Sequence, residues 1–166
     1  NNLWLLDLDS GSRRLLTPHE GDAFYSSPVA DPDGERIFLL SNQEREFRNL
    51  AVWEPGEQPD AGPRFIDETD WDRERLALSD DGRWLAMTTN EAGYSVLEVR
   101  DLEEQTTRRV RAFEDRIVGG LGFQPGGDTL AGTVSAADDT TDGWTLETGD
   151  HTTTRWTRSS TAGIPR

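Results

Sequence analysis

Short apolar runs separated by turn residues are the main pattern along the chain. Residues 3–6 and 37–40 form such runs, which are too short for ordinary helices, and no stretch keeps the spacing of an amphipathic helix. Asp33-Gly34 and Asp81-Gly82 lie between apolar runs. An aspartate–glycine pair tolerates the positive φ angles of a tight hairpin turn. The pattern therefore predicts an all-β chain made of hairpins.

The same strand–turn–strand unit recurs along the sequence. Its turn glycines are Gly34, Gly82 and Gly127, which are separated by 48 and 45 residues. A second hairpin follows each of these units, and a hairpin of the second kind also opens the chain. Two hairpins per period give four short antiparallel strands, which is the size of one blade of a β-propeller.

The repeat predicts a partial β-propeller of about three four-stranded antiparallel blades plus a half-blade. The half-blade and the three blades cover residues 1–18, about 25–67, 74–112 and 117–158. Closed propellers contain about 4–8 blades, so we expect residues 1–158 to be an arc of a larger ring. A smaller open repeat domain is the alternative. Residues 159–166 are expected to begin a linker.

Five segments carry a resemblance to a known family. They are residues 27–34, 45–50, 78–86, 90–95 and 155–166. These segments resemble the blades of the non-catalytic propeller in the prolyl oligopeptidase family of serine peptidases, especially its acylaminoacyl-peptidase and dipeptidyl-peptidase-like members. The last segment is similar to the end of the final blade and the start of the link to the hydrolase domain. The strand–turn pattern alone, of the WD40-like kind, is shared with the propeller of the Tol system.

The resemblance implies a hydrolase domain in the same parent chain and peptides as substrates. The parent would use a serine nucleophile, a histidine base and an aspartate on that missing domain. The propeller would shield the active site and admit only short or unstructured peptides. The alternative function is that of a non-enzymatic Tol-like or generic protein-binding propeller.

Motifs for catalysis, metals and cofactors are missing from the sequence itself. The nearest approach to the nucleophile elbow of a hydrolase is residues 93–97, which lack its closing glycine and lead into a predicted strand. We interpret Ser95 as a loop or strand-start residue. The carboxylates of residues 31–34 and 138–143 do not follow the spacing of a calcium-binding hand. We therefore predict no catalytic residue, no metal site and no cofactor in this segment.

One face of the predicted propeller carries the candidates for contact with substrate. Loops that join consecutive blades, and loops between the second and third strands of a blade, lie on the face that a hydrolase would cover. The substrate-facing candidates there are Glu44, Glu46, Arg48, Trp71, Asn90, Glu91 and Tyr94. A carboxylate suits the amino terminus of a peptide, and an arginine suits its carboxylate or a carbonyl. The alternative is that Glu46 and Arg48 pair with each other or join neighbouring blades.

Aromatic residues divide into two groups in the predicted strand order. Trp71 lies in an acidic loop between two blades, where it has no strand to pack in. The other five tryptophans fall within strand patterns, where packing between blades is the expected role. These five are Trp4, Trp53, Trp84, Trp144 and Trp156.

Composition narrows the possible partners. The 166 residues contain 32 acidic and 17 basic side chains, for a net charge of −15, and every basic side chain is arginine. The absence of lysine excludes a Walker A phosphate loop, and the absence of cysteine excludes disulfides and thiolate metal sites. Such an acidic surface disfavours nucleic acid and suits a halophilic protein. The alternative is an acidic, arginine-biased composition from a high-GC genome.

Apolar segments of the length needed for a membrane span, and the regions of a signal peptide, do not occur in the sequence. We therefore expect a cytoplasmic protein with no membrane partner.

Overall fold

The computed structural model describes residues 1–54, 62–160 and 162–163. Within these residues, antiparallel strands form three four-stranded sheets and one two-stranded hairpin, and the helical structure is a single 3-10 turn, η1 (Arg111–Phe113). The chain divides into two compact units, Asn1–Arg73 and Glu74–Arg166. No helix in the described parts of the chain is long and apolar enough to cross a membrane.

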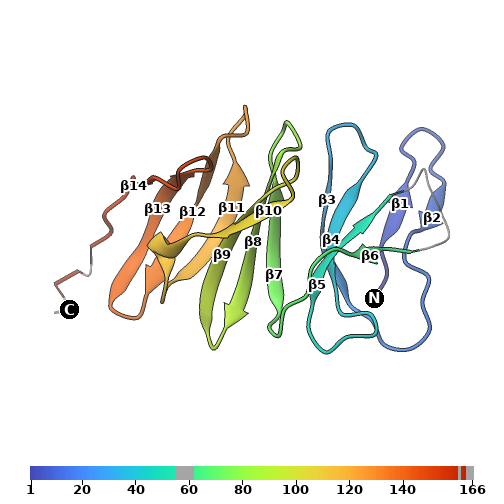
Figure 1. Ribbon diagram of the computed structural model, residues 1–166, viewed down its shortest axis with the longest axis horizontal. Coiled ribbons are helices and arrows are strands. Elements are labelled where there is room, and N and C mark those ends of the chain that lie inside the picture. The colour runs from blue at the N-terminus through green and yellow to red at the C-terminus, as the bar shows by residue number, and fades with distance from the viewer. Residues whose placement is uncertain (55–61, 161, 164–166) are drawn as a thin grey trace. The chain divides into compact units, whose positions relative to one another are not determined.

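The first unit contains a hairpin and one complete sheet, in which neighbours in sequence are neighbours in space (Figure 1). Its core includes Tyr25, Leu39 and Trp53, which are at most 2% exposed. The strands are β1 (Trp4–Leu6), β2 (Arg13–Leu15), β3 (Tyr25–Ala30), β4 (Ile37–Ser41), β5 (Asn49–Trp53) and β6 (Arg64–Phe65).

The second unit contains two complete sheets, drawn green to yellow and orange to red in Figure 1. Leu97, Phe113, Val118 and Leu130 belong to one buried cluster that joins the two sheets. The first sheet consists of β7 (Arg73–Leu78), which begins at the boundary between the units, β8 (Trp84–Glu91), β9 (Tyr94–Asp101) and β10 (Thr106–Arg109). The second consists of β11 (Ile117–Phe123), β12 (Thr129–Ala136), β13 (Asp139–Glu147) and β14 (Thr153–Arg155).

These sheets confirm the prediction of three four-stranded antiparallel blades and a half-blade. The turn glycines that marked the repeat, Gly34, Gly82 and Gly127, have φ angles of +73°, +74° and +87°. Residues with a Cβ rarely adopt this conformation, so the glycines are needed where they occur. All five residues of β5 are buried, as expected for an inner strand whose two faces are both covered.

The tryptophans predicted to pack within strands do not behave alike. Trp53 is 2% exposed, and Trp84 and Trp144 pack against the core of the second unit. The prediction is wrong for Trp4 and Trp156, which are 52% and 71% exposed. Trp4 lies on β1, which pairs only with β2, and Trp156 follows β14, an edge strand of its sheet, so both lie at edges of the strand pairing among the described residues.

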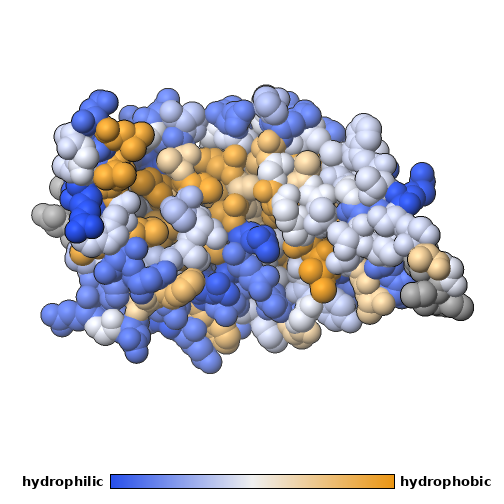
Figure 2. Space-filling model, turned by 180° about the vertical axis from the view of Figure 1, so that it is seen from behind, coloured by the Kyte–Doolittle hydropathy of each residue, from blue (hydrophilic) through white to orange (hydrophobic). Residues whose placement is uncertain are grey.

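The half-blade exposes an apolar surface. On and next to β1, Leu5, Leu6 and Leu8 are 45%, 55% and 89% exposed. Figure 2 shows hydrophobic residues over the part of the first unit that carries β1 and β2, on the left of that view. The strand pairs only with β2 in the described chain.

The predicted boundaries of the propeller segment and its linker stay predictions. The last strand, β14, ends at Arg155, before the expected linker at 159–166. Residues 161 and 164–166 of that linker lie outside the described residues.

Candidate functional site

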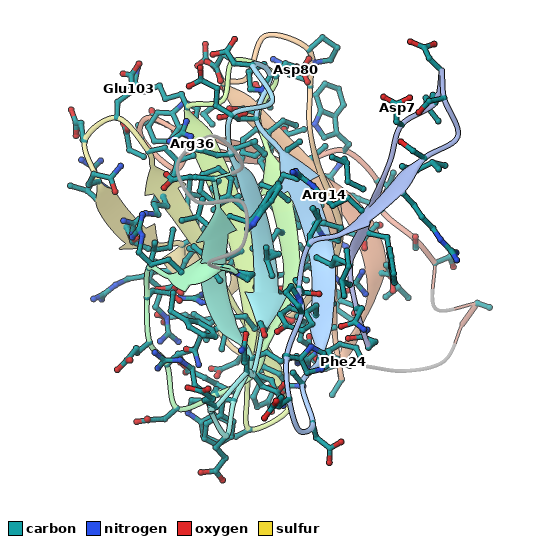
Figure 3. The ribbon with its side chains drawn as sticks, turned by 90° about the vertical axis from the view of Figure 1, so that its right-hand side faces the viewer. Asp7, Arg14, Phe24, Arg36, Asp80 and Glu103 are labelled. Carbon is teal, nitrogen blue, oxygen red and sulfur yellow. The ribbon has the colours of Figure 1, made fainter. Side chains whose placement is uncertain are left out.

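The two ends of each sheet carry different connections. In the first unit, Asp7 lies in the β1–β2 turn and Arg36 next to the β3–β4 turn, at the upper end in Figure 3. Phe24, which precedes β3, lies at the opposite end. The β4–β5 loop belongs to the end of Phe24, because the amide of Phe24 donates to Asn42 Oδ1 at 2.8 Å. The segment after β6 reaches the same end, because Asp72 accepts a hydrogen bond from that loop. This end, called the loop end below, carries the candidates of the first unit.

Arg48 is the most highly connected of the predicted residues at the loop end. Its Nε lies 3.2 Å from Asp72 Oδ1, and its backbone amide donates to the same oxygen at 2.8 Å. Its guanidinium lies 5.8 Å from the centre of the Phe24 ring. Arg48 therefore joins three connections of the first unit. Its ion-pair partner is Asp72, so the alternative in which it pairs with Glu46 is not the one found.

The carboxylate of Asp72 is held ionised at this point. Partial burial works to raise its pKa, but hydrogen bonds from the amide and the guanidinium of Arg48, together with the arginine's charge, hold the pKa below its usual value. A lowered pKa in the folded state stabilises the fold above about pH 4, and this contribution is lost as the pH falls through the lowered value.

The remaining candidates of the first unit are more exposed. Glu44 and Glu46 lie on the surface of the β4–β5 loop, and the backbone of Glu44 has a φ of +56°. Trp71 is 43% exposed, and its amide donates to Thr69 Oγ1 at 3.3 Å. Charged and aromatic side chains thus face solvent at the loop end of this unit.

The candidates of the second unit were predicted in a loop but lie in the strands beside the β8–β9 turn: Asn90 and Glu91 end β8, and Tyr94 begins β9. Asn90 shapes the turn, because its Oδ1 accepts the amide of Gly93 at 2.9 Å, and its Nδ2 donates to Glu74 at 3.2 Å. Glu91 lies 3.5 Å from the Arg109 guanidinium. Tyr94 is 47% exposed. The structure brings these three residues together within the second unit.

Ser95 has a structural role. It is the second residue of β9, and its Oγ accepts the amide of Val118 at 3.0 Å while its own amide donates to the carbonyl of Arg116 at 2.8 Å. These bonds connect β9 with β11 of the next sheet. The interpretation of Ser95 as a strand-start residue is confirmed.

Among the described residues, no group of three or more His, Cys, Asp or Glu side chains is placed to hold a metal ion.

A pocket at the end of the second unit opposite the β8–β9 turn was not predicted. It has a volume of about 640 Å³ and is lined by Arg108, Asp150 and His151 among others. Burial and the nearby charge of Arg108 lower the pKa of His151, against the effect of Asp150. Sequence spacing gave no signal for this pocket, because β10 and the β13–β14 turn belong to different blades.

Comparison with known proteins identifies solved structures with a similar fold. Neither a family model nor a curated protein matches the sequence. A solved prolyl endopeptidase matches 93% of this chain and 22% of its own, with 13% identity and a TM-score of 0.76. A puromycin-hydrolysing peptidase of Mycobacterium tuberculosis matches 93% and 24%, with 17% identity and a TM-score of 0.72. TolB from Acinetobacter baumannii matches 93% and 37%, with 15% identity and a TM-score of 0.67.

The chain is a partial β-propeller. It shares this fold with the peptidases that its sequence resembles and with TolB, and it spans less than two-fifths of each of these three structures. At this level of identity the likeness establishes the fold alone.

A first prediction concerns the role of Arg48 in the propeller. Arg48→Ala should lower the free energy of unfolding by about 0.5–1 kcal/mol, because it removes a half-exposed ion pair with Asp72. Glu46→Ala should change it by less than about 0.5 kcal/mol, because Glu46 is exposed and makes no ion pair within the described residues. Urea denaturation of both variants measures the difference. Equal losses would rule out a specific structural role for Arg48.

Proposed function

We propose that this chain is the non-catalytic propeller portion of a serine peptidase and that it gates the access of short peptides to a hydrolase domain of the same parent protein. The fold shared with prolyl endopeptidases and puromycin-hydrolysing peptidases supports this proposal. The observation that carries it is the exposure of charged and aromatic groups at the strand ends of each unit: Arg48 and Trp71 at the loop end of the first unit, and Tyr94 beside the β8–β9 turn of the second.

Each candidate has a chemical role in this proposal. Glu44, Glu46 and Glu91 provide carboxylates for the amino terminus of a peptide. Arg48 and Asn90 provide donors for peptide carbonyls, while Trp71 and Tyr94 offer flat apolar contacts. None of these groups breaks a bond. The hydrolase would supply the chemistry, and the ring would exclude folded chains by its size.

The charge of the chain fits this role. A net charge of −15 repels the phosphates of nucleic acid, so the proposed partners are peptides and the parent's own hydrolase domain. We include a cytoplasmic location and the absence of a membrane partner in the same proposal.

The second candidate function is that of a non-enzymatic protein-binding propeller. The likeness to TolB favours it, because that match covers as much of this chain as the match to the prolyl endopeptidase. Both candidates predict that residues 1–166 alone hydrolyse nothing, so an assay of the isolated segment does not separate them.

The full-length parent protein separates the two functions. The peptidase proposal predicts that a fluorophosphonate probe labels the parent and that the parent cleaves a short peptide while sparing the same sequence inside a folded protein. A parent in which the labelled serine is replaced by alanine is the control, and it should lose both labelling and cleavage. A parent that is neither labelled nor active would contradict the proposal and leave the protein-binding function.

A further inference from the structure

A small pocket in the second unit combines an apolar wall with a charged one. It has a volume of about 160 Å³ and lies between η1 and the strands β12, β13 and β14. The rings of Phe113 and Trp144 meet edge to face in its wall, with 5.6 Å between their centres, and Val134 is 6% exposed beside them. Charged side chains complete the lining.

Three of these charged side chains already have partners. Arg155 pairs with Asp142 and lies 3.5 Å from Asp139. The buried carboxylate of Asp142 also accepts the hydroxyl of Thr157 at 2.7 Å and the amide of Ser159 at 2.8 Å. Hydrogen bonds from Thr157, Ser159 and Arg155 hold the pKa of Asp142 far below its usual value, against the effect of burial. These groups form a fixed internal network and leave little capacity for a ligand.

Arg116 is the exception in this lining. It is half-buried, and its guanidinium makes no ion pair with any residue in the described part of the chain. The backbone of Arg116 is held by its carbonyl, which accepts the amide of Ser95 at 2.8 Å. A guanidinium that is partly withdrawn from water without a counter-ion favours the binding of an anion.

We propose that this pocket binds the carboxylate of a peptide through Arg116, with the small apolar side chain next to that carboxylate packed against Phe113 and Trp144. The arginine offers paired donors in the geometry that a carboxylate requires. The aromatic wall takes the apolar part.

The size and charge of the pocket select this ligand. Its volume equals that of about five waters, at about 30 Å³ each, which suits a single residue's side chain and not a folded segment. The charges of the two arginines and two aspartates in the lining cancel. A bound carboxylate would therefore leave the pocket with one net negative charge. A phosphate dianion would add two beside the buried Asp142 and is therefore disfavoured.

The pocket can be tested apart from the proposed function. As a contact for substrate, the pocket rests on the proposed function. η1 and the start of β13 lie at the same ends of their sheets as the β8–β9 turn, beside which the substrate-facing candidates of the second unit lie. As a binding site it belongs to residues 74–166 alone. Carboxylate binding by a parent that has no peptidase activity would remove the proposed function and keep the site.

Titration of residues 1–166 with N-acetyl-leucine at constant ionic strength, followed by two-dimensional NMR, tests the proposal. N-acetyl-leucine should shift the indole signal of Trp144, assigned with Trp144→Phe, whereas N-acetyl-leucinamide should not. Arg116→Gln should weaken binding about tenfold, and Arg116→Lys should restore part of it. Arg111→Gln is the matched control, because Arg111 is an exposed arginine of the same connection that lies outside the pocket lining. This variant should bind N-acetyl-leucine as tightly as unsubstituted residues 1–166 do.

Each of the following results would overturn the proposal. They are equal binding of the amide and the acid, unchanged binding by Arg116→Gln, and inorganic phosphate that binds more tightly than N-acetyl-leucine. An absence of any shift with N-acetyl-leucine at tens of millimolar would also overturn it. Circular dichroism of each variant establishes that the fold is retained.

Discussion

Leu97→Ala should lower the free energy of unfolding by about 2–5 kcal/mol, which is the largest effect we expect from a single substitution here. Leu97 lies in β9, is 2% exposed and belongs to the buried cluster that includes Phe113, Val118 and Leu130. The substitution removes apolar contacts and leaves a cavity where the two sheets of the second unit meet. Urea denaturation, followed by circular dichroism, measures the loss.

The matched control for this substitution is Leu8→Ala. Leu8 is 89% exposed in the β1–β2 turn, so the same chemical change there should alter stability by less than about 0.5 kcal/mol. A loss below about 1 kcal/mol for Leu97→Ala would contradict the packing of β9 against β11. That outcome would mean that the two sheets of the second unit are stabilised independently of each other.

Added salt should raise the thermal midpoint of unfolding. The excess of 15 negative charges repels itself in the compact chain, and raising potassium chloride from about 0.1 M to about 1 M shortens the Debye length from about 10 Å to about 3 Å. Screening also weakens exposed ion pairs, but 32 acidic groups face only 17 arginines, so relief of repulsion dominates. Each kcal/mol gained should raise the midpoint by about 2–4 °C. Differential scanning calorimetry across this range measures the effect.

A charge variant is the control for the salt prediction. Glu20→Gln, Asp22→Asn and Glu44→Gln together remove three exposed carboxylates that form no ion pair among the described residues. The triple variant should be more stable at low salt and should respond less to added salt. A midpoint that is highest at low salt would rule out the halophilic interpretation and favour a composition biased by the genome.

Local chemistry explains why the blades could be predicted from the sequence. The Asp-Gly turns require positive φ angles, and the apolar runs of β4 and β8 need cover on both faces, so each signal is contained within a few residues. Burial of side chains on the first and last strands of the described chain depends instead on whether a neighbouring sheet is present. Trp4 has the same strand pattern as Trp53, and yet it is 52% exposed, on a strand that pairs only with β2 in the described chain.

The candidate site was predictable in its position but not in its contacts. Turn order placed Arg48 correctly in the β4–β5 loop, but Asn90, expected in a loop, lies near the end of β8, beside the turn. The partner of Arg48 is Asp72, which is 24 residues away, whereas one alternative from the sequence was Glu46, two residues away. Arg116 gave no signal, because its role depends on an aromatic wall that comes from η1 and from β13 of the following blade.

The edge of β1 opposite β2 has no paired strand among the described residues, and this has a consequence for behaviour in solution. An apolar strand whose backbone groups lack a partner can add a strand from another molecule, which is the usual beginning of edge-to-edge aggregation. The net charge of −15 opposes this by keeping copies apart. Salt that stabilises the fold weakens this long-range repulsion, so folding stability and colloidal stability should change in opposite directions as salt is added.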